Sequence, residues 1–374
     1  MRNPLRSGVF AALALAFSSF GDAFLYPFLP VHYAEVGVPV VMVGLLLSIN
    51  RLVRLAANSL MVHAFLQWKF RRLTILATLL AIVSTFAHGF IGNIVLWIFF
   101  RIVWGMAFAT MRISSIQYAL ESPSKGMSVG LSRGIYEIGP MIALMIGPVI
   151  FNHAGAAATF AILGLLSLPG IFFAWQLPEM AQPETLSGSK LLGIPSSFDR
   201  LVFISAFVVE GILVVVIGYF LKDNMAMAAM LLAYRRLCLI FLSPLAGWLA
   251  DRRGFEKIFN SSFFLMTFGV FGLALANSTA TLVLAFTFIF TFNSVNAALA
   301  PYNAARADNR LKAVADNATW RDIGAAAGSL LGGSLLLLPD LTLIFLIIGA
   351  VMTSALVWHW QTLTIPIERF FKWK

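Results

Sequence analysis

The sequence has little of what a soluble protein depends on. Only 11% of its 374 residues are charged and 60% are hydrophobic, whereas soluble domains average about 25% charged and roughly 45–50% apolar residues. Its single cysteine, Cys238, excludes an internal disulfide and a metal site built from cysteines. There is no phosphate-binding glycine loop, and the five histidines have no metal-ligand spacing. These absences argue against a soluble domain, a disulfide scaffold and an ATP-driven pump, and we predict no cofactor and no metal.

Continuous apolar runs fill most of the chain instead. The mean hydropathy is +0.89, and the runs are unbroken rather than alternating, which favours membrane helices over barrel strands. At about 20 residues per span, we predict an all-α membrane protein with both termini on one side. Its twelve transmembrane helices are predicted at 8–33, 39–65, 73–92, 94–119, 127–152, 156–177, 199–221, 225–249, 256–277, 279–304, 313–338 and 341–362.

Basic residues are distributed very unevenly over the predicted loops. With both termini in the cytoplasm, 17 of the 26 lysines and arginines lie on that side, eight arginines lie inside spans, and only Lys222 lies opposite. Because Lys and Arg resist translocation, this bias predicts a cell inner membrane with cytoplasmic termini. It also accounts for most of the net charge of +10, so no nucleic-acid partner is expected.

The longest polar stretch lies in the middle of the chain. Residues 178–198 are rich in Pro, Ser and Gly, and we interpret them as a cytoplasmic linker. The linker would join an N-terminal six-helix bundle, 1–177, to a C-terminal six-helix bundle, 199–374.

The two halves also carry an internal repeat. An offset near 185 residues places Arg51 opposite Arg236, and Arg133 lies opposite Arg321 at a nearby offset of 188. At the same offset of 185, Asp22 corresponds to position 207, which lies within one helical turn of Glu210. Parallel repeats of this kind place the substrate site between the halves, near the bilayer midplane.

Three segments resemble signatures of the major facilitator superfamily. GWLADRRG at 247–254 is similar to the loop motif of that superfamily. RIVWGMAFA at 101–109 and, in part, GLSRGIYEIGPMIALMIGP at 130–148 are similar to patterns of its drug:proton antiporters. In the first-half copy of the loop motif, Leu66 stands where the aspartate is expected. The resemblance implies the major facilitator fold, with two pseudo-symmetric bundles that rock to give alternating access. It also implies conformational roles for Arg133, Glu137, Gly139 and Pro140.

The loop motif has a physical interpretation of its own. Gly247 and Gly254 allow a tight turn and a close helix approach. Asp251 can lie at a helix N-terminus or against Arg252 and Arg253. An ion pair there would latch the two halves in one state and break in the other. The alternative is a solvated loop that only sets topology.

Charged residues inside the spans cost about 2.5–3.5 kcal/mol each at the bilayer centre, so they should face a partner or a wet cavity. Counting along the helices puts Asp22 level with Arg51 and Glu210 level with Arg236. We predict these two acid–arginine pairs at mid-membrane; the alternative is that each pair is only structural. The intramembrane charges are Asp22, Glu137, Glu210 and Asp322, and Arg51, Arg54, Arg101, Arg112, Arg133, Arg235, Arg236 and Arg321.

Helical spacing groups these charges on a few faces. Arg133 and Glu137 at i, i+4 predict an intrahelical pair, and Arg112 is expected in a cavity or snorkelling to the cytoplasmic interface. Arg321 and Asp322 are adjacent, so each needs another partner. Three faces are predicted to line one polar cavity in the first half: Arg51, Arg54 and Asn58; Arg101 and Arg112; and Ser18, Asp22 and Tyr26.

Arginines outnumber acids two to one inside the spans, and a guanidinium binds a carboxylate or phosphate through two hydrogen bonds. The predicted cargo is therefore a small organic anion, such as a polycarboxylate, a phosphorylated molecule or an anionic metal chelate. Asp22 and Glu210 are predicted to couple transport to protons. The predicted substrate-binding residues are Arg51, Arg54, Arg101, Tyr26, Arg236, Asn293, Asn296 and Arg321.

Other functions remain open on the sequence alone. A proton-driven exporter of drugs or lipophilic cations would use Asp22 and Glu210 to attract its cargo, although the excess of arginine opposes this. A receptor or scaffold without transport is a third possibility. An enzyme is not expected, because no nucleophile–base set is found. The leading prediction is a monomeric secondary transporter whose partners are a small-molecule solute, protons and membrane lipids.

Overall fold

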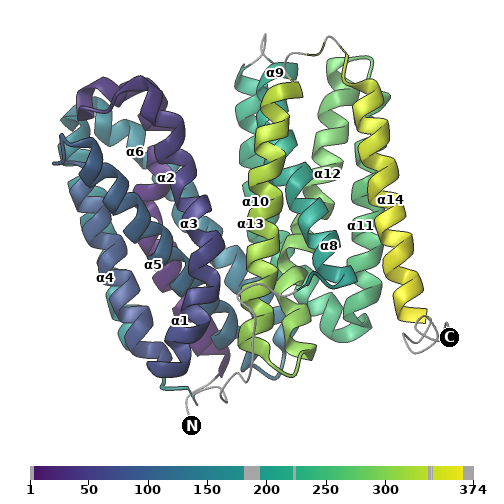
Figure 1. The fold of residues 1–374 in the computed structure, drawn as a ribbon, viewed down its shortest axis with the longest axis horizontal. Helices are drawn as coiled ribbons and strands as arrows, with labels where there is room; N and C mark the ends of the chain where they lie inside the picture. Colours follow the sequence, from purple (N-terminus) through teal and green to yellow (C-terminus); the bar gives the residue numbers. More distant parts are fainter. Residues whose placement is uncertain (1–3, 181–193, 222–224, 336–337, 339, 365–374) are drawn as a thin grey trace.

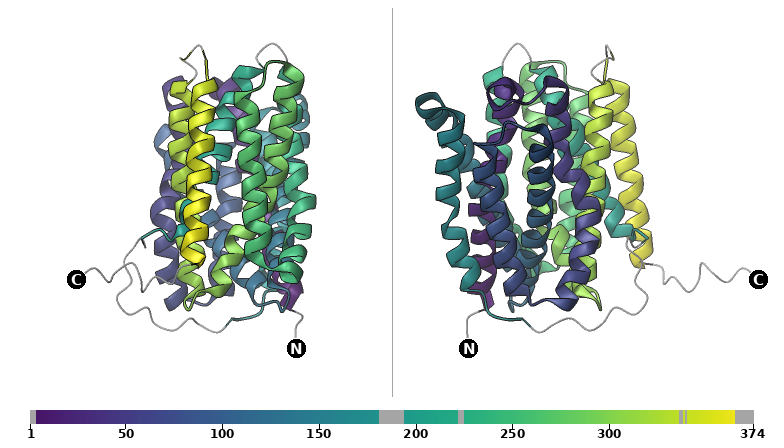
Figure 2. Two further views of the ribbon diagram at one scale, coloured as in Figure 1. Left: turned by 90° about the vertical axis from the view of Figure 1, so that its right-hand side faces the viewer. Right: turned by 60° about the vertical axis from the view of Figure 1, so that its left-hand side comes forward.

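The computed structural model describes residues 4–180, 194–221, 225–335, 338 and 340–364. Every regular element in these ranges is a helix. The helices form two bundles that stand side by side (Figure 1), and two further views show that the helix axes run nearly parallel (Figure 2). Most of the predicted linker, 178–198, lies outside the described residues.

The first bundle is built from the N-terminal half of the chain. Its elements are α1 (Pro4–Ser18), α2 (Phe20–His32), η1 (Tyr33–Val36), α3 (Val40–Gln67), α4 (Phe70–His88), α5 (Ile94–Leu120), α6 (Lys125–Ser167) and α7 (Pro169–Trp175). The first predicted span is divided between α1 and α2. At the junction, the hydroxyls of Ser18 and Ser19 donate to the carbonyls of Ala14 and Leu15 at 2.7 Å, a type of bond that bends helices.

The segment formed by α6 and α7 is too long for one membrane crossing. Lys125–Trp175 has 51 residues and spans about 75 Å at 1.5 Å per residue, against a hydrocarbon core of about 30 Å. At Gly155 the backbone adopts φ 75° and ψ 179°, a conformation reserved for glycine. The two predicted spans 127–152 and 156–177 therefore meet at Gly155.

The second bundle follows with a different irregularity. Its elements are α8 (Ser197–Ser205), the π-helix η2 (Ala206–Ile212), α9 (Leu213–Phe220), α10 (Met225–Arg253), α11 (Phe255–Ala274), α12 (Thr279–Leu299), η3 (Ala300–Arg306), α13 (Arg310–Leu335) and α14 (Thr342–Thr364). The predicted span 199–221 thus contains a π-helical turn in its middle.

Each of the twelve predicted spans coincides with one or more of these helices. Ten segments of the described chain are long and apolar enough to cross a membrane, and one of them, Lys125–Trp175, holds two predicted spans. Helix α13 is not among the ten, because its sequence carries Asp316, Arg321 and Asp322 along with small and polar residues. It packs between the halves, where its polar side chains find partners.

The two bundles touch on the side at which α1 begins and α14 ends, which we call the terminus side. There an apolar cluster joins Phe65, Tyr118 and Leu120 of the first bundle to Leu311 and Val314 of the second. Towards the opposite side the bundles diverge (Figure 1). The contact between the halves is therefore concentrated at one end of the helices.

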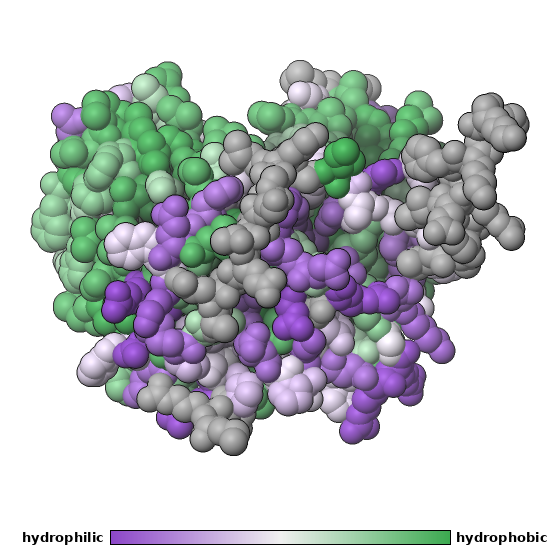
Figure 3. Space-filling view, turned by 60° about the horizontal axis from the view of Figure 1, so that its bottom comes forward, coloured by the Kyte–Doolittle hydropathy of each residue, from purple (hydrophilic) through white to green (hydrophobic). Residues whose placement is uncertain are grey.

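The molecular surface separates water-facing from lipid-facing areas. Figure 3 shows hydrophilic residues gathered on the terminus side and hydrophobic residues on the flanks. Large apolar side chains such as Leu76, Phe99, Phe241 and Phe268 are exposed on the outside of the helices. In water such exposure would be unfavourable, whereas around a membrane protein it meets lipid.

Candidate functional site

A cavity of about 380 Å³ lies between the two bundles, and we call it the central chamber. Seven arginines and four acids from inside the spans line it, and Arg101 is the one intramembrane arginine that does not. Of the eight residues predicted to line a polar cavity in the first half, Arg51, Arg54, Arg112, Asp22 and Tyr26 line this chamber, and Asn58, Arg101 and Ser18 do not. The lining residues are Ser19, Asp22, Ala23, Tyr26, Arg51, Arg54, Trp104, Phe108, Arg112, Arg133, Tyr136, Glu137, Pro140, Leu144, Glu210, Val214, Leu232, Arg235, Arg236, Leu239, Arg321, Asp322 and Ala325.

Asp22 binds a different arginine from the one predicted. Its Oδ1 lies 2.5 Å from Nη1 of Arg101, and it also accepts a hydrogen bond from Asn50 at 3.2 Å. Arg101 is 1% exposed and donates through Nε to the Leu46 carbonyl at 2.8 Å. The predicted Asp22–Arg51 pair is wrong in this structure, because counting residues gives depth in the membrane but not the direction a side chain points. Arg101 thus lies behind Asp22 rather than in the chamber.

Glu210 also binds an arginine of its own half, but not Arg236. Arg321 on α13 donates to Oε1 of Glu210 from Nε at 2.9 Å and from Nη2 at 2.7 Å. The predicted Glu210–Arg236 pair is therefore replaced by Glu210–Arg321. The π-helical turn that carries Glu210 shifts the direction of this side chain relative to regular helical spacing.

Glu137 links the two halves. It forms the predicted i, i+4 pair with Arg133 at 2.8 Å, and its other carboxylate oxygen lies 2.8 Å from Arg236 on α10. Its side chain is only 5% exposed. Arg236 reaches the chamber, as predicted, but its acid partner comes from the opposite bundle.

Asp322 is a second link between the halves, and the sequence did not suggest its role. From α13 it accepts hydrogen bonds from Arg54 at 3.2 Å, Arg112 at 2.9 Å and Asn58 at 3.4 Å, all in the first bundle. Arg112 is buried, so its predicted alternative of snorkelling to the interface is wrong. Two arginines held by one buried carboxylate leave this cluster with a net positive charge.

The two links between the halves are related by the internal repeat. The offset of 185 that aligns Arg51 with Arg236 also aligns Glu137 with Asp322. Each of these acids lies on a helix of one bundle and binds an arginine of the other. This match at the same offset is the signal in the sequence that could have identified Asp322 as a counterpart of Glu137.

Two guanidinium groups of the chamber have no acid partner among the described residues. Arg51 makes one long hydrogen bond to Ser329, at 3.5 Å. Arg235, which is not among the predicted binding residues, has a buried Nε without a hydrogen-bond partner. They come from opposite bundles, so an anion between them could contact both halves at once.

Aromatic rings form part of the chamber wall. The guanidinium of Arg54 lies over the ring of Phe108, 4.9 Å from its centre, and that of Arg133 lies 5.4 Å from the centre of Tyr136. Tyr26 lines the chamber as predicted, with its hydroxyl donating to the Leu47 carbonyl at 3.4 Å. Aromatic faces attract cations and planar groups, so these rings stabilise the guanidinium groups that lie over them.

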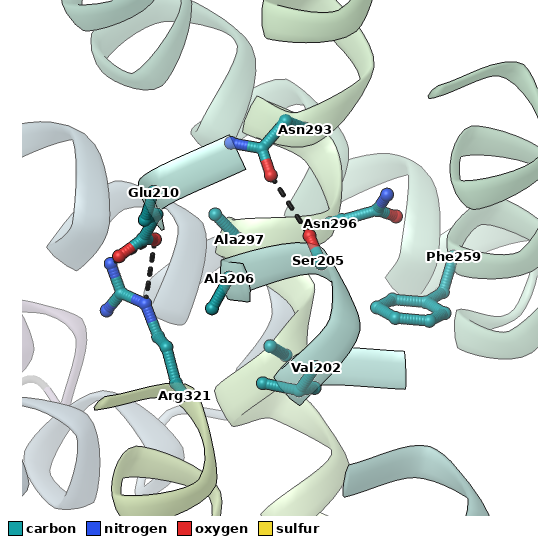
Figure 4. Close-up of a pocket in the computed structure, with 10 residues that line it drawn as sticks. Val202, Ser205, Ala206, Glu210, Phe259, Asn293, Asn296, Ala297 and Arg321 are labelled. Carbon is teal, nitrogen blue, oxygen red and sulfur yellow. Dashed lines mark hydrogen bonds and ion pairs between the residues drawn. The ribbon is translucent and has the colours of Figure 1, made fainter. Parts of the chain in front are cut away.

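The predicted residues Asn293 and Asn296 do not reach the central chamber. They line a second cavity of about 20 Å³ inside the C-terminal bundle, which we call the side pocket (Figure 4). Glu210 and Arg321 line both cavities and so lie between them. The other residues of the side pocket are Val202, Ser205, Ala206, Phe259, Ala297 and Ala300.

The loop motif lies where the two halves meet on the terminus side. The carboxylate of Asp251 accepts hydrogen bonds from the backbone N–H groups of Gly126 and Met127, both at 2.9 Å, at the start of α6. This is the predicted position at a helix N-terminus, and the helix belongs to the opposite bundle. A Cβ on Gly247 would lie 1.9 Å from the Gly126 carbonyl oxygen, so α6 and α10 approach as closely as glycine permits.

The remaining residues with predicted conformational roles occupy several places. Gly254 has φ 92° at the turn between α10 and α11, and Arg252 lies over the ring of Trp248, 4.1 Å from its centre. Arg253 is exposed. Gly139 lets α6 pack on α1, since a Cβ there would lie 2.0 Å from the Ala16 carbonyl oxygen. Pro140, next along α6, lines the chamber.

Among the described residues, no group of three His, Cys, Asp or Glu side chains could hold a metal ion. The central chamber is instead a cavity of about 380 Å³ that is lined by guanidinium groups. Such a set can bind carboxylate or phosphate, exchange partners when an anion enters, and shift contacts between the halves.

Comparison with known proteins places the fold. No family model and no curated protein matches the chain in sequence. The human organic anion transporter MFSD10 (TETRAN) superposes with a TM-score of 0.78 at 13% identity, over 96% of this chain and 99% of that one. The major facilitator proton:xylose symporter XylE superposes with a TM-score of 0.75 at 14% identity, covering 96% and 94%. An outward-facing bacterial homologue of the iron transporter ferroportin gives 0.73 at 14% identity, covering 96% and 98%.

These likenesses extend over nearly the whole chain. At such low sequence identity they show the fold, which is the major facilitator fold predicted from the three motifs and the internal repeat. The cargo and the coupling ion are not determined by the fold, because one fold hosts many functions.

Proposed function

We propose that this chain, which has the major facilitator fold, is a secondary transporter that moves a small organic anion across a cell inner membrane by alternating access coupled to protons. The observation that carries the proposal is the central chamber, in which seven arginines face four acids. A volume of about 380 Å³ falls in the range of sites for small molecules, roughly 300–1,000 Å³. A matched structure is described as an organic anion transporter, which supports the same class of cargo.

The two arginines without acid partners define the expected binding mode. Arg51 and Arg235 both line the chamber, and they come from α3 and α10 of opposite bundles. Guanidinium groups bind carboxylate and phosphate through paired, charge-assisted hydrogen bonds. A cargo with two anionic groups, such as a dicarboxylate, would neutralise both arginines and hold the two halves together.

Proton coupling is proposed for Asp22 and Glu210. Each forms an ion pair with one arginine of its own half, Arg101 or Arg321. Protonation of either acid would weaken that pair and release a guanidinium, so proton and anion binding would depend on each other. Two matched structures are described as proton symporters, which is consistent with this coupling.

Alternating access would use the contacts between the halves as a latch. On the terminus side, Asp251 binds the start of α6, and Glu137 and Asp322 form ion pairs across the interface. When the bundles rock, these contacts must break while others form on the opposite side. Gly247, Arg252, Arg253 and Gly254 would then act in the change of state rather than in binding cargo.

The proposal also covers the orientation of the chain in the membrane and its oligomeric state. The bias of 17 basic residues against one supports cytoplasmic termini, and the hydrophilic terminus side in Figure 3 fits a cytoplasmic face. We propose a monomer, in which residues 1–177 and 199–374 form the two bundles and 178–198 the linker.

The test uses purified protein in proteoliposomes with an imposed pH gradient. We expect saturable uptake of at least one of succinate, citrate and phosphoenolpyruvate, and no uptake of the lipophilic cation tetraphenylphosphonium. Arg51→Lys should raise KM for the transported anion about tenfold, because it loses the bidentate bond worth roughly 1.5–3 kcal/mol. Arg72→Lys, at an exposed position on α4 that has no role in the proposal, is the matched control and should leave KM unchanged.

The same assay decides against the proposal in two ways. Transport of tetraphenylphosphonium without transport of any anion would favour the cation exporter. Anion uptake that is independent of the pH gradient would retain the cargo class and remove proton coupling.

A further inference from the structure

The side pocket is the right size for one water molecule. Its volume is about 20 Å³, and a polar cavity of roughly 10–15 Å³ or more can hold a single water with two to four polar partners. Its polar lining is Glu210, Arg321, Ser205, Asn293 and Asn296, and the rest is small and apolar side chains. A pocket of this size is too small for cargo.

Two polar atoms at the side pocket lack partners among the described residues. Asn293 is 2% exposed and its Nδ2 makes no hydrogen bond, while its Oδ1 accepts from the Ser205 hydroxyl at 3.1 Å (Figure 4). Both hydrogen bonds from Arg321 go to Oε1 of Glu210, and Oε2 receives none. A buried donor without a partner costs about 1–3 kcal/mol, so a water in the side pocket that accepts from Asn293 Nδ2 is favoured.

The backbone places Glu210 at this point by an irregular turn. Residues Ala206–Ile212 are π-helical, and π-turns inside helices occur frequently at functional sites. Gly211 follows Glu210, and a Cβ there would lie 2.5 Å from the Cα of Gly328 on α13. The π-helix and α13 therefore approach closely enough for Arg321 to reach the carboxylate.

The side pocket lies on the terminus side of Glu210. Val202 and Phe259 are one to two turns from the terminus-side starts of α8 and α11, and Ala300 directly follows the terminus-side end of α12. Phe259 packs against Phe198, with ring centres 4.7 Å apart. Glu210 thus has the central chamber on one side and the side pocket on the other.

We propose that the side pocket holds a water molecule that carries protons between Glu210 and the solution on the terminus side. This inference rests on the proposed proton coupling and assigns its path. The water would accept a hydrogen bond from Asn293 Nδ2 and donate one to Glu210 Oε2. In loading, the water receives a proton from the terminus side as it gives one to Oε2, so the carboxylate becomes neutral and the water is unchanged.

The charges around Glu210 link this step to the cargo. Arg321 from α13, Arg235 from α10 and Arg133 from α6 all act on its carboxylate, and Asp322 neighbours Arg321 along α13. An anion in the chamber that attracts Arg321 would leave Glu210 without its arginine partner. Proton binding through the side pocket would then compensate for the lost pair, so anion and proton would enter together.

The path can be tested without knowing the cargo. Infrared difference spectra of the purified protein between acidic and alkaline pH should contain a carboxyl band that is absent in Glu210→Gln. After a rapid pH jump, Ala297→Val, which fills the pocket, should slow the appearance of that band at least tenfold. Asn293→Leu, which removes the orphan amide, should slow it similarly. Ala326→Val is the control, since this half-buried alanine on α13 lines neither cavity.

The outcomes separate the path from the proposed function. If the wild type has no band assigned to Glu210, proton coupling at this residue is refuted together with the path. If the band is present but its rate is the same in Ala297→Val, Asn293→Leu and the wild type, Glu210 carries a proton by another route and the side pocket is only structural. Ala206→Val also fills the pocket and replaces Ala297→Val if that variant does not fold.

Discussion

Two seams join the halves, and they are built by different means. In the α6–α10 seam the backbones touch: Gly126 and Gly247 leave no room for a side chain, and Asp251 binds the backbone N–H groups of α6. In the α3–α13 seam the side chains touch: Asp322 of α13 is held by Arg54 of α3 and by Arg112 of the neighbouring α5. The glycine contact of the first seam should therefore be sensitive to volume and the second seam to charge, although the first seam also holds the Glu137–Arg236 ion pair.

The internal repeat makes the difference between the seams more specific. The offset of 185 equates Gly126 with Leu311 and Gly247 with Val62, and both counterparts pack in the apolar cluster of the α3–α13 seam. Asp251 corresponds to Leu66 in the same way. The degraded first-half motif is thus explained by an apolar contact that replaces the backbone latch.

The largest effect on stability is expected from the α3–α13 seam, where charged side chains make the contact. Asp322→Ala would leave the guanidinium groups of Arg54 and Arg112 buried without their acid, and breaking a buried pair in this way costs about 3–5 kcal/mol. Thermal unfolding in detergent should show this loss of stability. Asp316→Ala on the same helix removes a partly exposed i, i+4 pair with Lys312, which should cost only about 0.3–0.5 kcal/mol. Equal losses in the two variants would show that Asp322 does not hold the seam.

The glycine contact of the α6–α10 seam should respond next most strongly, because it leaves no volume for a side chain. In Gly247→Ala the new Cβ would meet the Gly126 carbonyl oxygen at 1.9 Å, and overpacking of this kind costs about 1–3 kcal/mol. We expect the conformation with a closed terminus side to lose population about tenfold, because 1.4 kcal/mol is a factor of ten. Spin-label distances between Ser124→Cys and Arg253→Cys, in a Cys238→Ser background, would measure this.

The control for this substitution is Gly44→Ala on α3. Nothing lies within 4 Å of a Cβ at Gly44, so the change should be neutral or stabilise the helix by up to about 1 kcal/mol. If Gly44→Ala shifted the distances as much as Gly247→Ala, the effect would come from glycine in general and not from the seam.

Much of the fold was predictable because hydrophobic length determines where membrane helices lie. The predicted span 94–119 became α5, Ile94–Leu120, and the predicted span 39–65 became α3, Val40–Gln67. The turn at Gly155 fell between two predicted spans, since glycine follows a polar interruption there. A repeat at a constant offset then indicated two related bundles, and the motifs indicated how they are arranged.

The sequence predicted which charged residues make up the site. It did not predict which acid binds which arginine. The arginines and acids of the site could be identified because charged residues are rare inside membrane spans. Asp22 and Glu210, however, each bind a different arginine from the predicted one. Pairing depends on the direction of each side chain around its helix and on the π-turn at Glu210, which spacing alone does not reveal. Asn293 and Asn296 were placed in the wrong cavity for the same reason.

The latch aspartate should have a smaller effect than either seam contact. Asp251→Asn keeps the size of the side chain and removes the charge that favours the N-terminus of α6, a loss of about 1 kcal/mol. The spin-label distances should shift by roughly fivefold in population towards the open terminus side.

Asp340→Asn is the matched control for the latch. Asp340 accepts a hydrogen bond from the Thr342 backbone N–H at 2.9 Å, at the start of α14 in its own bundle. The hydrogen bonds from Thr342 lower the pKa of Asp340, so its contribution to stability is present at neutral pH and is lost as the pH falls through that lowered pKa. The substitution should leave the spin-label distances unchanged, and a shift equal to that of Asp251→Asn would mean that the effect does not arise at the seam.

The smallest effect on stability is expected at the solvent-exposed rim of the α3–α13 seam. Glu121 and Arg310 lie 3.8 Å apart with side chains 52% and 42% exposed, and exposed pairs contribute about 0–1 kcal/mol and are screened by salt. Glu121→Gln should change neither the melting temperature nor the spin-label distances measurably. A destabilisation comparable to that of Asp322→Ala would show that the rim, rather than the buried carboxylate, holds α13 to the first bundle, and the contrast between the two seams would then have to be redrawn.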